Sequence, residues 1–168
     1  SEDLTEQINW DLDLDFPVYI YDATWQDGHL FLAGRTTDSN SSGLLLKVDE
    51  SGISEMHIDT TQSSFFAIQA SAGEVWTTKS YGTDNAYSHS SFGKAFDETG
   101  YEEMTVLNGG MPFVPYSISG DELDFFITGT EGTTYWQASA PAASRVTVET
   151  TNLDSLIIEW SNGEIGQS

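Results

Sequence analysis

Two stretches of the chain, Asp49-Glu50-Ser51-Gly52 and Asp97-Glu98-Thr99-Gly100, have nearly the same sequence and decide the fold. Each is followed at the same offset by a glutamate and a methionine, Glu55-Met56 in the first case and Glu103-Met104 in the second. Two anchors that recur in the same order indicate an internal repeat, in which one turn and the strand after it occur twice.

A second kind of turn recurs along the whole chain, with a spacing of about 40–50 residues. Each copy has turn residues followed by the start of a short apolar segment. The four copies are Asp27-Gly28-His29-Leu30, Ala72-Gly73-Glu74-Val75, Gly120-Asp121-Glu122-Leu123 and Asn162-Gly163-Glu164-Ile165. A repeat of this length with four strand-sized segments in each copy is typical of propeller blades.

Short β-branched and aromatic segments, separated by clusters of Gly, Asp, Asn and Ser, predict the strands. They are 18–23, 30–34, 43–48 and 54–58 in the first copy, 66–70, 74–79, 91–96 and 102–107 in the second, and 114–118, 123–128, 134–138 and 145–149 in the third. No apolar stripe with a period of 3.6 residues predicts a helix. We therefore expect an all-β fold of antiparallel four-stranded repeats.

In repeat length and turn placement the chain resembles the β-propeller superfamily over nearly its full length. The resemblance implies a small or partial β-propeller of about three and a half blades. It implies one domain, 1–168, with repeats at about 17–60, 64–108 and 112–152 and partial strands at 1–16 and 153–168. The WD40, kelch and sialidase signatures are absent, so the resemblance implies an architecture and no activity.

The two partial strands leave sheet edges that must be covered or paired. Residues 8–16 predict an outermost strand without its blade, and residues 155–160 an innermost strand without its partners. Three arrangements are open: the ends meet in one incomplete fourth blade, two chains complete each other, or a binding partner caps an open propeller. Whether the protein is a monomer or a dimer is open with them.

The charge of the chain limits its partners. Twenty-seven acidic residues and five basic residues give a formal net charge of −22. Such a chain repels phosphate backbones and anionic membranes, so we expect no direct nucleic-acid partner and no membrane partner. A basic protein would be attracted and steered toward it. Adaptation to a salty habitat is the other explanation of the charge.

Residue types limit the chemistry as well. The chain has no cysteine, which excludes disulfides, thiolate catalysis and cysteine-ligated zinc. This fits a cytoplasmic protein, with a periplasmic or secreted location as the alternative. The histidines His29, His57 and His89 lack metal-ligand spacing, and no nucleophile motif accompanies them. We expect no metal, no cofactor and no enzymatic activity.

The run Asp11-Leu12-Asp13-Leu14-Asp15-Phe16 resembles the start of a calcium loop, but Phe16 stands where the loop needs glycine. Its strict alternation instead predicts a strand with Leu12, Leu14 and Phe16 facing the core and the aspartates facing water. A row of carboxylates at a sheet edge repels unrelated strands or attracts a cationic one.

Polar loops are the other candidate binding surface, at 36–42, 81–90 and 129–133. The second is the longest and combines tyrosines with acidic residues, which suits recognition of Lys and Arg on a protein. The candidate partner-binding residues of the run and the loops are Asp11, Asp13, Asp15, Asp38, Tyr81, Asp84, Tyr87 and Glu131.

In composition the chain is similar to the acidic immunity proteins of bacterial toxin systems. This similarity implies an inhibitor that neutralises a basic toxin, such as a nuclease, by masking its active site. The alternative is an exported or cell-surface propeller-like module that binds a glycan or a protein and is acidic through adaptation to salt. A glycan would stack on tryptophans, for which Trp25, Trp76, Trp136 and Trp160 are the candidates.

Overall fold

The computed structural model of the chain describes residues 12, 14–37, 41–83, 86–110, 112–121, 124–130, 132–137, 146–152 and 155–160. Over these residues the fold is all-β and antiparallel, as the sequence predicts, and the only helix is a 3₁₀ turn, η1 (Leu107–Gly110). The strands are β1 (Val18–Gln26), β2 (His29–Thr36), β3 (Ser42–Asp49), β4 (Gly52–Ser71), β5 (Glu74–Thr83), β6 (Ala86–Ala95), β7 (Tyr101–Val106), β8 (Pro115–Asp121), β9 (Asp124–Gly129), β10 (Gly132–Gln137), β11 (Val146–Asn152) and β12 (Ser155–Trp160).

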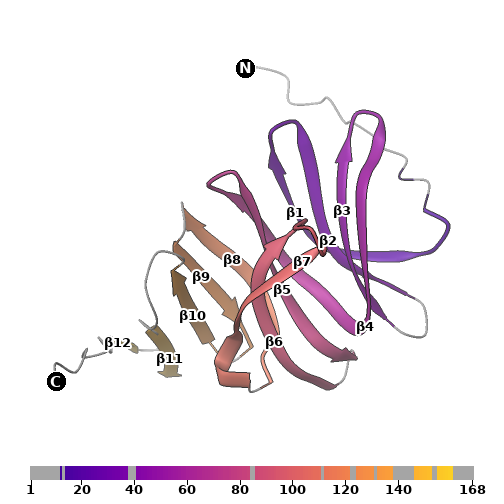
Figure 1. Cartoon of the computed structure of the whole chain (residues 1–168). Helices are drawn as coiled ribbons and strands as arrows, with labels where there is room; N and C mark the ends of the chain where they lie inside the picture. The colour runs from indigo at the N-terminus through magenta and orange to yellow at the C-terminus, as the bar shows by residue number, and fades with distance from the viewer. Residues whose placement is uncertain are drawn as a thin grey trace, which may run out of the picture.

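The strands form two sheets (Figure 1). The first has seven strands in the order β1-β2-β3-β4-β5-β6-β7, and the second has five in the order β12-β11-β10-β9-β8. Neighbours in each sheet are therefore neighbours in the chain. This order follows from short connections between consecutive strands.

Strand β4 is 20 residues long and belongs to two layers at once. Its first half pairs with β3 and its second half, from Ser63 on, pairs with β5. The polar residues 60–64 therefore lie inside this strand. The bend is made locally: Asp59 Oδ1 accepts hydrogen bonds from the backbone N–H and the hydroxyl of Thr61, at 2.9 and 2.7 Å.

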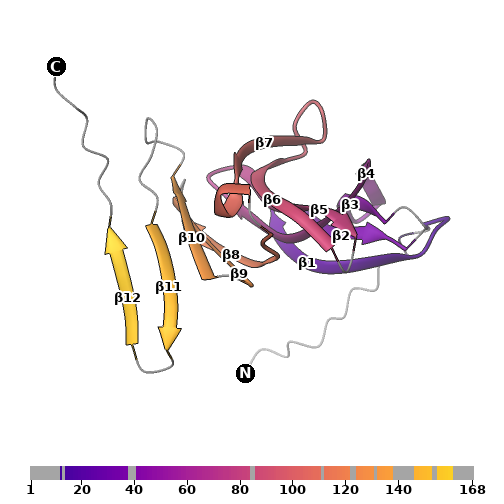
Figure 2. The same cartoon turned by 90° about the horizontal axis from the view of Figure 1, so that it is seen from below.

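Three layers result, and Figure 2 views them from below. Layer one is β1–β3 with the first half of β4, layer two is the second half of β4 with β5–β7, and layer three is the sheet that begins with β8. One apolar cluster lies between layers one and two, and it comprises Phe31, Ala33, Leu45, Phe65, Ile68, Val75 and Ala95. Another lies between layers two and three, and it comprises Trp76, Phe92, Leu107, Phe113, Phe125 and Ile127.

The other face of layer one carries a third cluster of Leu32, Leu44, Leu46 and Val48. Leu12 and Leu14 pack against this cluster, so the predicted inward direction of these two leucines is confirmed. The predicted strand is wrong for the described residues of this run, because Leu12 and Leu14 have no regular secondary structure and Asp15 and Phe16 form a bend before β1. Pro17 follows, and proline has no N–H to donate to a sheet.

The layers contact one another in the same way along the stack. Their first hairpins end in the pairs Gln26–His29, Ser71–Glu74 and Asp121–Asp124. Two residues before the first of these pairs, Thr24 Oγ1 accepts a hydrogen bond from Ala70 N at 3.2 Å. At the equivalent position, Gln69 Nε2 donates to Gly120 O at 2.7 Å. Strands β1, β4 and β8 are thus linked at equivalent positions, with the direction of the hydrogen bond reversed between the two contacts.

The described sheets do not close into a propeller. The prediction of an isolated innermost strand at 155–160 is wrong as well, because β12 pairs with β11 in the third layer. Asn152 at the end of β11 pairs with Ser155 at the start of β12.

Candidate partner-binding site

Five of the eight candidate binding residues, Asp11, Asp13, Asp38, Asp84 and Glu131, lie outside the residues that the structure describes. The other three are Asp15, Tyr81 and Tyr87. Asp15 is exposed in the bend before β1. The two tyrosines lie in strands.

The predicted loop at 81–90 is wrong, because β5 extends to Thr83 and β6 begins at Ala86. Tyr81 pairs with His89, whereas Tyr87 pairs with Gly82. The register shifts between these two pairs, and the two tyrosines have different neighbours: the Tyr81 ring stacks on His89, whereas the Tyr87 hydroxyl lies 3.3 Å from Ser64 Oγ. The structure therefore does not bring them together.

The polar composition of this segment suggested a loop, but Ser90 at its end and Ser80 just before it are buried. Ser80 and Ser90 are fully buried, and their Oγ atoms lie 2.6 Å apart. Ser90 also donates to the backbone carbonyl of Phe113. Serine can occupy a buried strand when its hydroxyl has such partners. The spacing of residues along the sequence does not predict buried serines of this kind.

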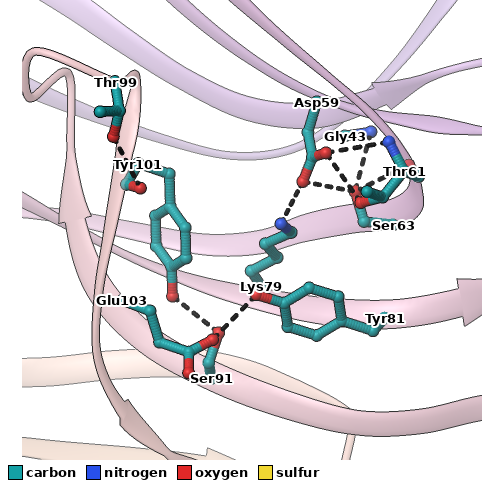
Figure 3. A network of polar contacts seen from close by, with 10 residues as sticks. All are labelled: Gly43, Asp59, Thr61, Ser63, Lys79, Tyr81, Ser91, Thr99, Tyr101 and Glu103. Carbon is teal, nitrogen blue, oxygen red and sulfur yellow. Dashed lines mark hydrogen bonds and ion pairs between the residues drawn. The ribbon is translucent and has the colours of Figure 1, made fainter.

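Lys79 is the centre of the polar network drawn in Figure 3. Only 7% of this residue is exposed, and its ammonium group forms an ion pair with Asp59. The same ammonium lies 4.2 Å from the centroid of the Tyr81 ring and 5.5 Å from that of Tyr101. The positive charge of Lys79 is thus neutralised inside the molecule by one carboxylate and two aromatic rings.

Burial raises the pKa of Asp59, but the hydrogen bond from Lys79 and those from Thr61 outweigh it and hold the pKa below its usual value. Asp59 therefore stays ionised beside Lys79. Half-buried His57 lies on the same strand, and desolvation lowers its pKa.

Tyr81 links this interior to the surface. Its hydroxyl donates to Glu103 Oε2 at 2.8 Å, and its ring stacks on His89 with centroids 4.3 Å apart. Burial, followed by the hydrogen bond to Glu103, raises the pKa of Tyr81 to about 12. Tyr101 is buried more deeply beside Ser91, and burial raises its pKa as well. Glu103 is the exposed end of the network and is held in place by a neutral phenol.

The other described basic side chains also lie over aromatic rings. Arg35 lies over Tyr19 at 5.2 Å, Lys47 over Phe31 at 5.7 Å, and Lys94 over Trp76 at 5.5 Å. In each case the two residues are paired across adjacent strands. Sequence reasoning missed these pairs, because they follow from strand register and not from the distance along the chain.

Exposed apolar side chains occupy several strands. They are Tyr19, Ile20, Tyr21 and Trp25 on β1, Met56 on β4, Met104 and Val106 on β7, Tyr116 on β8, and Phe126 on β9. Of the tryptophans predicted to stack on a glycan, Trp76 is buried in the core and is inaccessible to a ligand, whereas Trp25 is exposed. The side chain of Trp160 lies outside the description.

Within the described residues no group of three or more histidine, aspartate or glutamate side chains could hold a metal ion. No helix in the described part of the chain has the length and apolar character needed to cross a membrane. No protein-family model matches the sequence, and no curated protein matches it.

Proposed function

We propose that the chain is an acidic, non-enzymatic protein that binds a basic protein. In this proposal it is an immunity or inhibitor protein that neutralises a basic toxin, such as a nuclease, by masking its active site. The observation that carries the proposal is the placement of the four described basic side chains, Arg35, Lys47, Lys79 and Lys94, over aromatic rings of the chain itself.

This placement determines how the net charge of −22 is available to a partner. Arg35 and Lys79 are buried, and Lys94 is paired with Glu74 at 3.2 Å. Among the described residues, few cations are left at the surface to neutralise carboxylates such as Glu55, Glu102 and Glu103, which are exposed. The surface therefore attracts a cationic protein and repels nucleic acid. On a nuclease, its carboxylates would occupy positions that bind phosphates of the substrate.

The fold that we propose for this protein is a partial propeller. The support is the repeated contact between innermost strands, Thr24 to Ala70 and Gln69 to Gly120, since each layer meets the next at the same position. An open stack leaves the outer face of its last layer available to a partner.

The test is to express the chain together with the protein encoded by the adjacent gene and to purify the two at low and at moderate salt. We expect a one-to-one complex with a basic protein, with a Kd below about 1 μM that rises with salt. If the activity of that protein is nucleolytic or otherwise toxic, the complex should be inactive. The absence of any complex at low salt would contradict the proposal.

A further inference from the structure

One position of the repeat carries an aromatic ring in each of the three layers. The second strand of each layer begins at His29, Glu74 or Asp124. The aromatic residues lie two positions further on and are Phe31, Trp76 and Phe126. Phe31 is 6% exposed and Trp76 is 1% exposed, each in the apolar cluster shared with the following layer. Phe126 is 47% exposed. The third layer therefore presents to solvent the ring that the first two layers bury.

The residue paired across the sheet with this ring is a lysine in the first two layers. Lys47 pairs with Phe31 and Lys94 with Trp76, and each ammonium lies over its ring. In the third layer the paired residue is Tyr135, whose ring centroid lies 5.1 Å from that of Phe126. Among the described residues, no lysine or arginine is placed over Phe126.

The third layer also has a carboxylate at the position that Glu74 occupies in layer two. In layer two Glu74 Oε1 accepts a hydrogen bond from Lys94 at 3.2 Å. Asp124 occupies the equivalent position, is exposed, and accepts a hydrogen bond from the hydroxyl of Tyr135 at 3.0 Å. The described residues of the third layer thus include the ring and the carboxylate of layer two, with Tyr135 at the position of the lysine.

We infer that the cation comes from the partner. In this inference, which rests on the proposed function, the face formed by Asp124, Phe126 and Tyr135 (the Phe126 face) docks a basic protein. An arginine or lysine side chain of that protein lies over the Phe126 ring and against the Asp124 carboxylate. Trp76, Lys94 and Glu74 are the template for this contact.

Charge selects this occupant over a second copy of the chain. Two copies, each with a net charge of −22, repel each other, whereas a basic protein is attracted to the same face. An exposed phenylalanine beside a carboxylate offers a guanidinium or ammonium group both a ring and an ion pair.

The probe for the inference is a short glycine–arginine peptide, Gly-Arg-Gly-Arg, titrated into the full chain and followed by NMR. We expect the signals of Phe126 and Tyr135 to shift most. Phe126→Ala and Asp124→Asn should each weaken binding about two- to fivefold, the range for one exposed cation–π contact or surface ion pair. Tyr135→Lys should weaken binding at least as much, because its own ammonium would take the place of the guanidinium.

Matched controls separate this face from the general field of the protein. Met56 is also 47% exposed, so Met56→Ala removes an equally accessible apolar side chain from another layer. Glu55→Gln removes one exposed carboxylate, as Asp124→Asn does. Both control variants should bind the peptide nearly as well as the unaltered chain.

Each other outcome overturns the inference in a recognisable way. If the peptide binds but shifts signals elsewhere, and Phe126→Ala binds as tightly as Met56→Ala, the Phe126 face is not the site and the proposed function stands. If the chain is a dimer in solution and Phe126→Ala makes it a monomer, a second copy occupies the face. If no peptide binds at low salt, the proposed function fails together with the inference.

Discussion

The ammonium group of Lys79 lies 4.2 Å from the centroid of the Tyr81 ring, two residues along the same strand. It also pairs with Asp59, which lies at the bend of β4. The contact therefore joins layer one, which contains Asp59, to layer two, which contains Lys79 and Tyr81. A buried charge between layers has a large effect on stability when either partner is removed.

Asp59→Asn should lower the free energy of unfolding by about 3–5 kcal/mol, because Lys79 stays buried with its charge uncompensated. Lys79→Met should lower the free energy of unfolding by a similar amount, because the carboxylate of Asp59 then loses its cation. The double variant should recover part of the loss, since both charges are then gone. Urea denaturation of the four proteins measures the coupling. Strictly additive effects of the two substitutions would contradict a direct pair.

The low pKa of Asp59 predicts how its contribution depends on pH. A carboxyl group whose pKa is lower in the folded state than its ordinary 3.8 contributes stability above that value. The contribution is lost as the pH falls through the folded-state pKa. The difference in unfolding free energy between the unaltered chain and Asp59→Asn should thus be constant above about pH 5 and shrink at lower pH.

This difference must be measured against a matched variant, because acid also relieves the repulsion among the many other carboxylates. Glu55→Gln removes an exposed carboxylate from the same strand. Its difference from the unaltered chain should be small at every pH. If the difference in unfolding free energy between the unaltered chain and Asp59→Asn grows in acid, the pKa of Asp59 is not lowered by folding.

The strands were predictable because the turns between them carry glycine and small polar residues at a regular spacing. The continuity of β4 was not, since Asp59 to Ser64 is a polar run typical of a loop. It is a strand because Asp59 and Gln62 pair with β3, and Ser63 and Ser64 pair with β5. Tyr81 was selected from the sequence, but its contacts with His89 and Glu103 were not, because these residues reach it through the register of β6 and β7.

Tyr81 should ionise near pH 12, because burial and its hydrogen bond to Glu103 favour the neutral phenol. Since the ordinary value is 10.0, the stability that Tyr81 contributes is present below pH 10 and is lost as the pH rises toward 12. Glu103→Gln should lower the pKa of Tyr81 without restoring the ordinary value, since burial is the larger cause. Tyrosinate absorbance with Tyr81→Phe as the reference measures this shift, and an unchanged titration in Glu103→Gln would contradict it.

The turn of the second hairpin offers a stabilising substitution. Ala72 and Gly73 occupy the two turn positions with φ of 53° and 79°, and Asp27 and Gly28 occupy the same positions in the first hairpin with 49° and 79°. Alanine is strained at a positive φ, whereas asparagine adopts it readily and Asn-Gly is the preferred pair for such a turn. Ala72 is exposed, so a larger side chain meets no obstacle.

Ala72→Asn should therefore raise the free energy of unfolding by about 0.5–1 kcal/mol, the usual gain from removing local backbone strain. For a chain of this length this corresponds to a rise in Tm of about 1–4 °C. Asp27→Ala makes the opposite change at the equivalent turn and should lower the Tm. If both variants shift the Tm in the same direction, strain at these turn positions does not control stability, and the two hairpins are not equivalent in the way that the repeat requires.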